Sequence, residues 1–138
     1  MPLIQLVYAS QPFGFDEAML AGILLDARRC NERDDITGAL IVRRDLYLQL
    51  LEGPQKDVTA CYARICRDDR HIEPKKLVQR SIKTRLFPGW AMLDDPAQSW
   101  VWSMDDVRAG AIDETTDDEV LGFFNRLAAE RVTSFPKK

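Results

Sequence analysis

The chain has 138 residues, of which 46% are hydrophobic and 30% charged, and its formal net charge is −3 at pH 7. This length predicts one globular domain, and basic residues interleaved with acids argue against nucleic-acid binding. No run approaches the roughly 20 apolar residues of a membrane helix and no secretion signal is visible at the N-terminus, so we expect a cytoplasmic protein.

The first two thirds of the chain alternate between strand-like and helix-like apolar periodicity. In chain order the pattern predicts a strand over Leu3 to Tyr8, a helix over Asp16 to Cys30, a hairpin of strands over Thr37 to Val42 and Leu46 to Leu51, a helix with Pro54 at its first position, a strand over Lys76 to Ile82 and a short strand over Trp90 to Leu93. The order β-α-β-β-α-β is ferredoxin-like. We therefore expect an α+β fold with a fifth short strand, two helices crossing one face of the sheet, and C-terminal helices.

The last 40 residues carry helix signals of their own. Ser103 predicts the cap of a short helix that begins at Met104 and ends at Gly110, and Thr116 with Glu119 forms a capping box for a helix to about Arg131. The apolar stripe of this last helix must cover either the free sheet face or a partner subunit. We divide the chain into a domain over residues 1–97 and a helical extension over residues 98–138, and we expect a homodimer.

Polar residues occupy three positions where the periodicity predicts a core-facing side chain: Tyr8, Asn31 and Gln49. A buried polar group is costly unless the interior satisfies it. Three such residues on separate elements indicate a polar guest inside the fold. Each also has a structural interpretation, because Tyr8 could be a satisfied core tyrosine, Gln49 could lie on a solvated face, and Asn31 could end its helix.

Several other residues admit two interpretations. Arg64 and Asp68 are four apart, which is typical of a helix surface pair, yet with Arg70 they could also form a rim that grips an anionic ligand tail. Trp90 and Met92 could simply pack the core. The three cysteines form no paired motif and the chain has one histidine, so we expect buried thiols and no metal site.

Six segments occur together in a fixed order over residues 2 to about 95. They are Tyr8, Asn31, Ile36 to Leu40, Gln49 to Gly53, Asp68 to His71, and Arg85 to Met92. In this combination the chain resembles the BLUF family, blue-light sensors that use flavin. The spacing from Asn31 through Gln49 to Met92 fits without gaps. The chain departs from the family in having one residue fewer than is common between Tyr8 and Asn31, and Cys30 where relatives often have Asn or His.

The resemblance implies a flavin, usually FAD, with FMN or riboflavin as alternatives, held between the two crossing helices. Tyr8 and Gln49 would lie against the N5/O4 edge of the ring, and Asn31 would bind the pyrimidine end. The resemblance also implies that the ring lies between Ile23, Leu24 and Ile36, and that Arg64, Asp68 and Arg70 lie near the ribityl and phosphate side.

The resemblance further implies a photoreceptor flavoprotein that performs no net catalysis. Light would drive electron and proton transfer from Tyr8, leaving Gln49 with changed hydrogen bonds. The strand containing Trp90 and Met92 would relay the change to the C-terminal helices and onward to a separate effector protein. Neither nucleic acid nor membrane is expected as a partner.

Two alternative functions remain at this point. A light-insensitive ferredoxin-like module for ligand binding or dimerisation would be colourless. A flavin-dependent enzyme would need a substrate pocket and a general acid or base, and the sequence offers no such constellation.

Overall fold

A five-stranded sheet forms the centre of the computed structural model, which describes residues 3–12, 17–68, 71–90, 92–96 and 101–130. The strands are β1 (Leu3–Pro12), β2 (Thr37–Arg43), β3 (Leu46–Pro54), β4 (His71–Ile82) and β5 (Leu93–Pro96). Their spatial order is β4-β1-β3-β2-β5. The first four pair antiparallel, and β5 joins parallel to β2. The ferredoxin-like prediction is confirmed.

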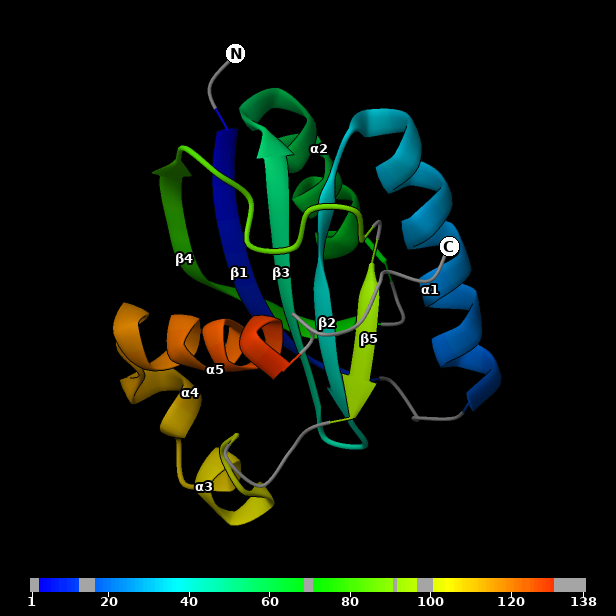
Figure 1. The fold of residues 1–138 in the computed structure, drawn as a ribbon. Helices are drawn as coiled ribbons and strands as arrows, with labels where there is room; N and C mark the ends of the chain where they lie inside the picture. Colours follow the sequence, from blue (N-terminus) through cyan, green and yellow to red (C-terminus); the bar gives the residue numbers. More distant parts are fainter. Residues whose placement is uncertain (1–2, 13–16, 69–70, 91, 97–100, 131–138) are drawn as a thin grey trace.

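Helices lie on both sides of this sheet. They are α1 (Glu17–Asp34), α2 (Gln55–Cys66), α3 (Met104–Arg108), α4 (Ala111–Glu114) and α5 (Asp117–Glu130). In Figure 1, α5 crosses in front of the sheet and α2 lies behind it, while α1 runs beside the β5 edge. The predicted cap is present, since Ser103 forms a reciprocal capping box with Asp106 at the start of α3.

The sheet is buried on both faces, which gives the protein two apolar cores. Alternate side chains of β1 point to opposite sides, so Leu6 lies in the core beneath α1 and α2 while Val7 lies in the core beneath α5. Buried residues of α5 fill the second core: Val120, Leu121, Phe124 and Leu127. The apolar stripe of α5 therefore covers the second face of its own sheet.

The first helix runs four residues further than predicted, and its end has a physical cause. Asp35 adopts a left-handed conformation, with φ of 57°, and the Ile36 amide donates to the Asn31 carbonyl over 2.9 Å. This is the Schellman arrangement, in which glycine usually occupies the left-handed position. Because aspartate stands there instead, the cap is hard to predict from the sequence. Asn31 lies inside the last turns of α1.

The fifth strand was predicted too early in the chain. β5 begins at Leu93, opposite Ala39 of β2, whereas Trp90 precedes it and accepts a 3.1 Å hydrogen bond on its carbonyl from the Gly38 amide. A Cβ at position 38 would lie 1.9 Å from the Leu50 carbonyl oxygen, so only glycine lets β2 come this close to β3 at this position.

The start of the second helix also differs from the prediction. Pro54 is the N-cap residue of α2 and not its first helical residue.

A buried carboxylate ties the end of β3 to the segment that leads to Trp90. Glu52 is fully buried and accepts hydrogen bonds from the Leu86 amide at 2.9 Å and the Phe87 amide at 2.6 Å. The side chains of Gln5 and Thr37, on the strands either side of β3, donate to the same carboxylate at 3.3 Å each. Four donors compensate the carboxylate for the loss of water.

We expect Glu52→Gln to lower the free energy of unfolding by about 2–4 kcal/mol. The variant would replace one accepting carboxylate oxygen with an amide NH₂ group, which donates and would therefore face groups that also donate. Urea unfolding would measure the loss. Glu32→Gln, an exposed site on α1, is the matched control and should change stability by less than about 0.5 kcal/mol. Equal stability of the two variants would contradict this role for Glu52.

Candidate functional site

A tyrosine and a glutamine face each other in the middle of the sheet. Tyr8 on β1 and Gln49 on β3 are directly opposed in the antiparallel register, and they are 0% and 4% exposed. The Tyr8 hydroxyl donates a hydrogen bond to Gln49 Oε1. The solvated-face interpretation of Gln49 is therefore wrong, and each of the two side chains provides a partner that the other needs.

The other end of the Gln49 amide meets a sulfur atom. Gln49 Nε2 donates to the Sδ atom of Met92 over 3.3 Å, and Met92 is itself 1% exposed. Because an amide has one accepting and one donating end, the Tyr8 hydroxyl and the Met92 sulfur together define its orientation. The result is a buried chain of contacts from Tyr8 through Gln49 to Met92.

A cavity of about 280 Å³ opens beside this chain, between α1 and α2 and against β3. Helical spacing on α1 and α2 and alternate positions on β3 direct its lining residues inward. They are Ile23, Asp26, Ala27, Arg29, Cys30, Asn31, Gln49, Leu51, Cys61, Arg64, Ile65 and Asp68. Apolar walls with a few amide and charged groups are typical of a site for a small molecule.

The structure brings together five of the residues singled out from the sequence. Ile23, Asn31, Gln49, Arg64 and Asp68 all line the cavity. They come from α1, from β3 and from the end of α2 with the residues just beyond it, and two of them carry side-chain amides, Asn31 and Gln49.

The remaining predicted residues lie elsewhere. Tyr8, Leu24 and Ile36 belong to the apolar core around the cavity and do not line it. Arg70 lies outside the described residues. Trp90 packs against the core on the α5 side, whereas Met92 lies in the core beneath α1 and α2, so this pair spans both layers.

Most of the lining residues that the sequence interpretation missed were visible as a pattern. Ala27 and Cys30 continue the face of α1 that carries Ile23, and Cys61 and Ile65 lie four residues apart on one face of α2. From the sequence alone, these two apolar stripes indicate only helix faces that pack against the sheet. The signal that was missed is that the two stripes face each other across a gap.

Arg64 is held at the cavity by a residue of the other helix. Its Nη2 lies 3.4 Å from Asp34 Oδ2 at the end of α1. A hydrogen bond from Arg33 lowers the pKa of Asp34 below its ordinary value, and the Arg64 charge adds to this effect. The two helices are thus bridged by an ion pair on the rim of the cavity.

The buried phenol and thiol groups at the site keep their protons at neutral pH. Burial, with a smaller contribution from Cys61, raises the pKa of Tyr8 well above its ordinary value, so its hydroxyl remains a donor. The Tyr62 ring lies 5.4 Å from the Tyr8 ring, centroid to centroid. Burial also raises the pKa of Tyr62 to about 12 and that of Cys61 to about 11.

The raised pKa of Cys61 predicts that the protein becomes less stable at alkaline pH. Since burial raises its folded-state pKa from an ordinary value near 9 to about 11, the unfolded chain loses this proton first as the pH rises. The contribution of the Cys61 thiol to the free energy of unfolding is fully present below about pH 9. It is lost between about pH 9 and 11 and amounts to about 2–3 kcal/mol. Cys61→Ala should flatten this part of the stability-versus-pH curve.

Val58→Ala, on the same buried face of α2, is the control for this experiment. It should lower stability at every pH and retain the wild-type slope between pH 9 and 11. Denaturant unfolding at several pH values would measure both variants, and an unchanged slope in Cys61→Ala would contradict the prediction.

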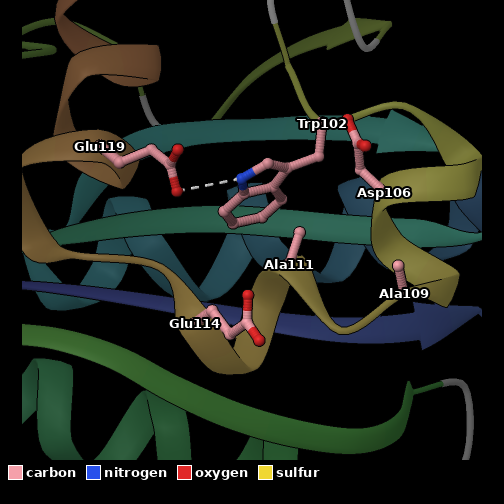
Figure 2. A pocket seen from close by; sticks show the side chains of 6 residues that line it. All are labelled: Trp102, Asp106, Ala109, Ala111, Glu114 and Glu119. Atoms are coloured by element: carbon pink, nitrogen blue, oxygen red, sulfur yellow. Dashed lines mark hydrogen bonds between the residues drawn. The ribbon is translucent and has the colours of Figure 1, made fainter.

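A second cavity, of about 350 Å³, lies among the C-terminal helices. Figure 2 shows the Trp102 indole against this cavity, with its Nε1 donating to Glu119. That hydrogen bond is 3.2 Å long, and Thr115 Oγ1 donates to the same carboxylate oxygen. Glu119 thus connects the start of α5 to the segment that precedes α3.

The described parts of the chain contain no cluster of three or more His, Cys, Asp or Glu side chains that could hold a metal ion. Among the helices that the structure describes, none has the length and apolarity required to cross a membrane.

Comparison with known proteins connects this geometry to light sensing. Residues 3–93 match the sequence profile of the family described as sensors of blue-light using FAD. The blue light- and temperature-regulated antirepressor BluF of Escherichia coli K12 is 33% identical over 120 residues. Photoactivated adenylate cyclase subunit beta of Euglena gracilis is 34% identical over 74 residues.

These aligned regions cover 79% and 53% of this chain but only 29% and 9% of the two relatives, so the chain spans less than a third of either protein. Solved structures of similar extent also match. The photo-activated state of BlsA superposes with a TM-score of 0.77 at 26% identity and covers 99% of both chains. The dark state of the BLUF protein BlrB gives 0.79 at 26% identity, covering 94% of this chain and 97% of that one.

Proposed function

The chain belongs to the family of sensors of blue light using FAD, and from this premise we propose that it is a blue-light photoreceptor that binds a flavin non-covalently. The observation that carries the proposal is the buried chain of contacts from Tyr8 through Gln49 to Met92, beside a cavity between α1 and α2. The proposal assigns the protein to signalling and not to catalytic turnover.

The proposed cofactor is FAD. The cavity of about 280 Å³ suits the ring system of a flavin, with the amides of Gln49 and Asn31 for its polar edges and Ile23 among its apolar walls. Arg64 and Asp68 would hold the polar chain that leaves the ring, with Arg70 as a further contact. FMN and riboflavin share the same ring, so they are alternative ligands of this site.

The flavin, when bound, supplies absorption of blue light and an excited state that accepts an electron. Tyr8 would give the flavin an electron and then its hydroxyl proton, which would leave along the hydrogen bond to Gln49 Oε1. Both would return to Tyr8 when the radical pair recombines within the site, so no net oxidation would result. The Gln49 amide would be left rotated, tautomerised or both, which changes which groups it donates to and accepts from.

Met92 and Trp90 are the proposed relay. Met92 contacts Gln49 in one core, and Trp90 packs in the other core beneath α5. β2 joins this segment to the C-terminal part of the chain, because the Gly38 amide donates to the Trp90 carbonyl and Arg43 Nη1 donates to the Trp102 carbonyl over 2.6 Å. Residues 1–97 would act as the sensor and residues 98–138 as the output segment.

The output partner is proposed to be a separate protein. The names of the relatives describe an antirepressor and a cyclase subunit, which supports an effector protein and not nucleic acid or a membrane as the direct partner of this chain. We propose that the protein works in the cytoplasm as a homodimer.

A stronger hydrogen bond from the rearranged Gln49 to the flavin carbonyl would move the absorption slightly to the red in the light. We expect Tyr8→Phe and Gln49→Leu to bind flavin and to lose this red shift, because each removes one end of the Tyr8–Gln49 hydrogen bond. An absorption spectrum before and after blue light, followed through dark recovery, is the measurement. Tyr47→Phe, on the same face of the sheet as Tyr8, and Gln55→Leu, exposed at the start of α2, should retain the shift.

Two results would overturn the proposal. A wild-type protein that is colourless and cannot be reconstituted with FAD would favour a light-insensitive binding module. A normal light response in Tyr8→Phe or Gln49→Leu would exclude the proposed chemistry while leaving flavin binding intact.

The output route is best tested without truncation. Removing α5 would expose the apolar core that it covers, so a deletion would unfold the domain as well as remove the output. Instead, we expect backbone amides of α5 to exchange hydrogen at a different rate in the light in the wild type. Trp90→Leu should abolish this difference and retain the red shift. Mass spectrometry of hydrogen exchange would measure it, and an undiminished difference in Trp90→Leu would contradict the route.

A further inference from the structure

Met92 is held at two ends by two different elements. Its sulfur accepts the 3.3 Å hydrogen bond from Gln49 on β3. Its main-chain carbonyl accepts two hydrogen bonds from Arg28 on α1, at 3.2 Å from Nε and 2.9 Å from Nη2. Met92, whose side chain contacts Gln49, is therefore bonded to β3 through its sulfur and to α1 through its main-chain carbonyl.

The Arg28 contact is specific. Both N–H groups come from one edge of the guanidinium plane and converge on a single oxygen, which restrains the position of the carbonyl more than one donor would. The contact joins residues 64 positions apart in the sequence. Arg28 also lies three residues before Asn31, so the same segment of α1 lines the cavity and holds Met92.

The neighbouring backbone explains why Met92 needs this support. β5 begins one residue later, at Leu93, so the Met92 carbonyl lies at the entry to the strand. A methionine side chain is unbranched and adapts easily to its surroundings. If the backbone of Met92 could move, its sulfur could take many positions, and only some of these would lie within hydrogen-bonding distance of Gln49 Nε2.

We propose that Arg28 is a positioning residue for the photochemical site. By fixing the backbone of Met92, it keeps the sulfur where the Gln49 amide must return, and so it sets the rate at which the light-altered state reverts in the dark. The inference rests on the proposed photoreceptor function. It assigns Arg28 no contact with the flavin and no part in the electron or proton transfer.

The direction of the effect follows from the contacts that recovery must rebuild. Recovery returns Gln49 Nε2 to the Met92 sulfur, and a mobile Met92 would first have to be ordered. Losing Arg28 should therefore slow dark recovery by about three- to tenfold, the range expected for ordering one flexible side chain. The light-induced shift itself should persist, because Tyr8 and Gln49 are intact.

The experiment compares Arg28→Ala and Arg28→Lys with Arg33→Ala. Arg33 is an exposed residue of the same helix that pairs with its neighbour Asp34, so Arg33→Ala makes the same chemical change away from Met92. Two readouts are needed. Dark recovery of the absorption shift measures the rate, and the NMR signal of a ¹³C-labelled Met92 methyl group measures its order in the flavin-free protein and in the dark flavin-loaded protein.

The expected result is slow recovery and a shifted or broadened Met92 methyl signal in Arg28→Ala. Arg28→Lys should be intermediate, since one ammonium replaces two converging donors, and Arg33→Ala should match the wild type. The chain has four methionines, and Met92→Leu would identify the signal by its disappearance.

Wild-type recovery in Arg28→Ala would overturn the inference, whether or not the methyl signal changes. A merely structural role would likewise be indicated if Arg28→Ala and Arg33→Ala slowed recovery equally. Failure of the proposed function would look different, because the wild type would then show no light-induced shift, while the methyl signal of the flavin-free protein would still report whether Arg28 orders Met92.

Discussion

The hydrogen bond from the Tyr8 hydroxyl to Gln49 Oε1 is the constraint on which the rest of the site depends. The strand order places β1 and β3 in the interior of the sheet, with apolar layers on both faces, so neither side chain has access to bulk water. Each must find its partner within the protein. Once Tyr8 takes the accepting end of the amide, the donating end must point to another acceptor, and Met92 provides it.

Both faces of the sheet around Gln49 are covered by packed side chains. β3 is buried along almost its whole length, so a change at Gln49 has packed neighbours on each side. The segment from Trp90 to Met92 contributes one side chain to each core. Glu52, three residues beyond Gln49 on the same strand, fixes the amides of Leu86 and Phe87 just before that segment. The proposed path from the site to α5 would therefore pass a segment whose backbone amides are held by Glu52.

The sequence predicted the parts of the fold that local periodicity controls. Alternation in β1 and β3 placed Tyr8 and Gln49 on one face, and the ferredoxin-like order followed from the spacing of the elements. The Schellman cap at Asp35 was missed because the usual glycine is absent, and the start of β5 was missed because it depends on pairing with a distant strand. Arg28 and Glu52 were missed for the same reason, since a charged residue on a helix or at a strand end gives no sign of a partner 35 or 64 positions away.

The two bonds of the Gln49 amide differ in strength, and this difference indicates which of them changes in the proposed cycle. A phenol hydroxyl bonded to an amide oxygen joins a good donor to a good acceptor, whereas a thioether sulfur is a weak acceptor. A rearrangement of the amide loses least when it gives up the contact with sulfur. Met92 also keeps its place when that contact is lost, because the two hydrogen bonds from Arg28 hold its carbonyl independently of its side chain. In the proposed cycle the weak contact to the Met92 side chain would therefore break and re-form while the Met92 carbonyl stays anchored to α1.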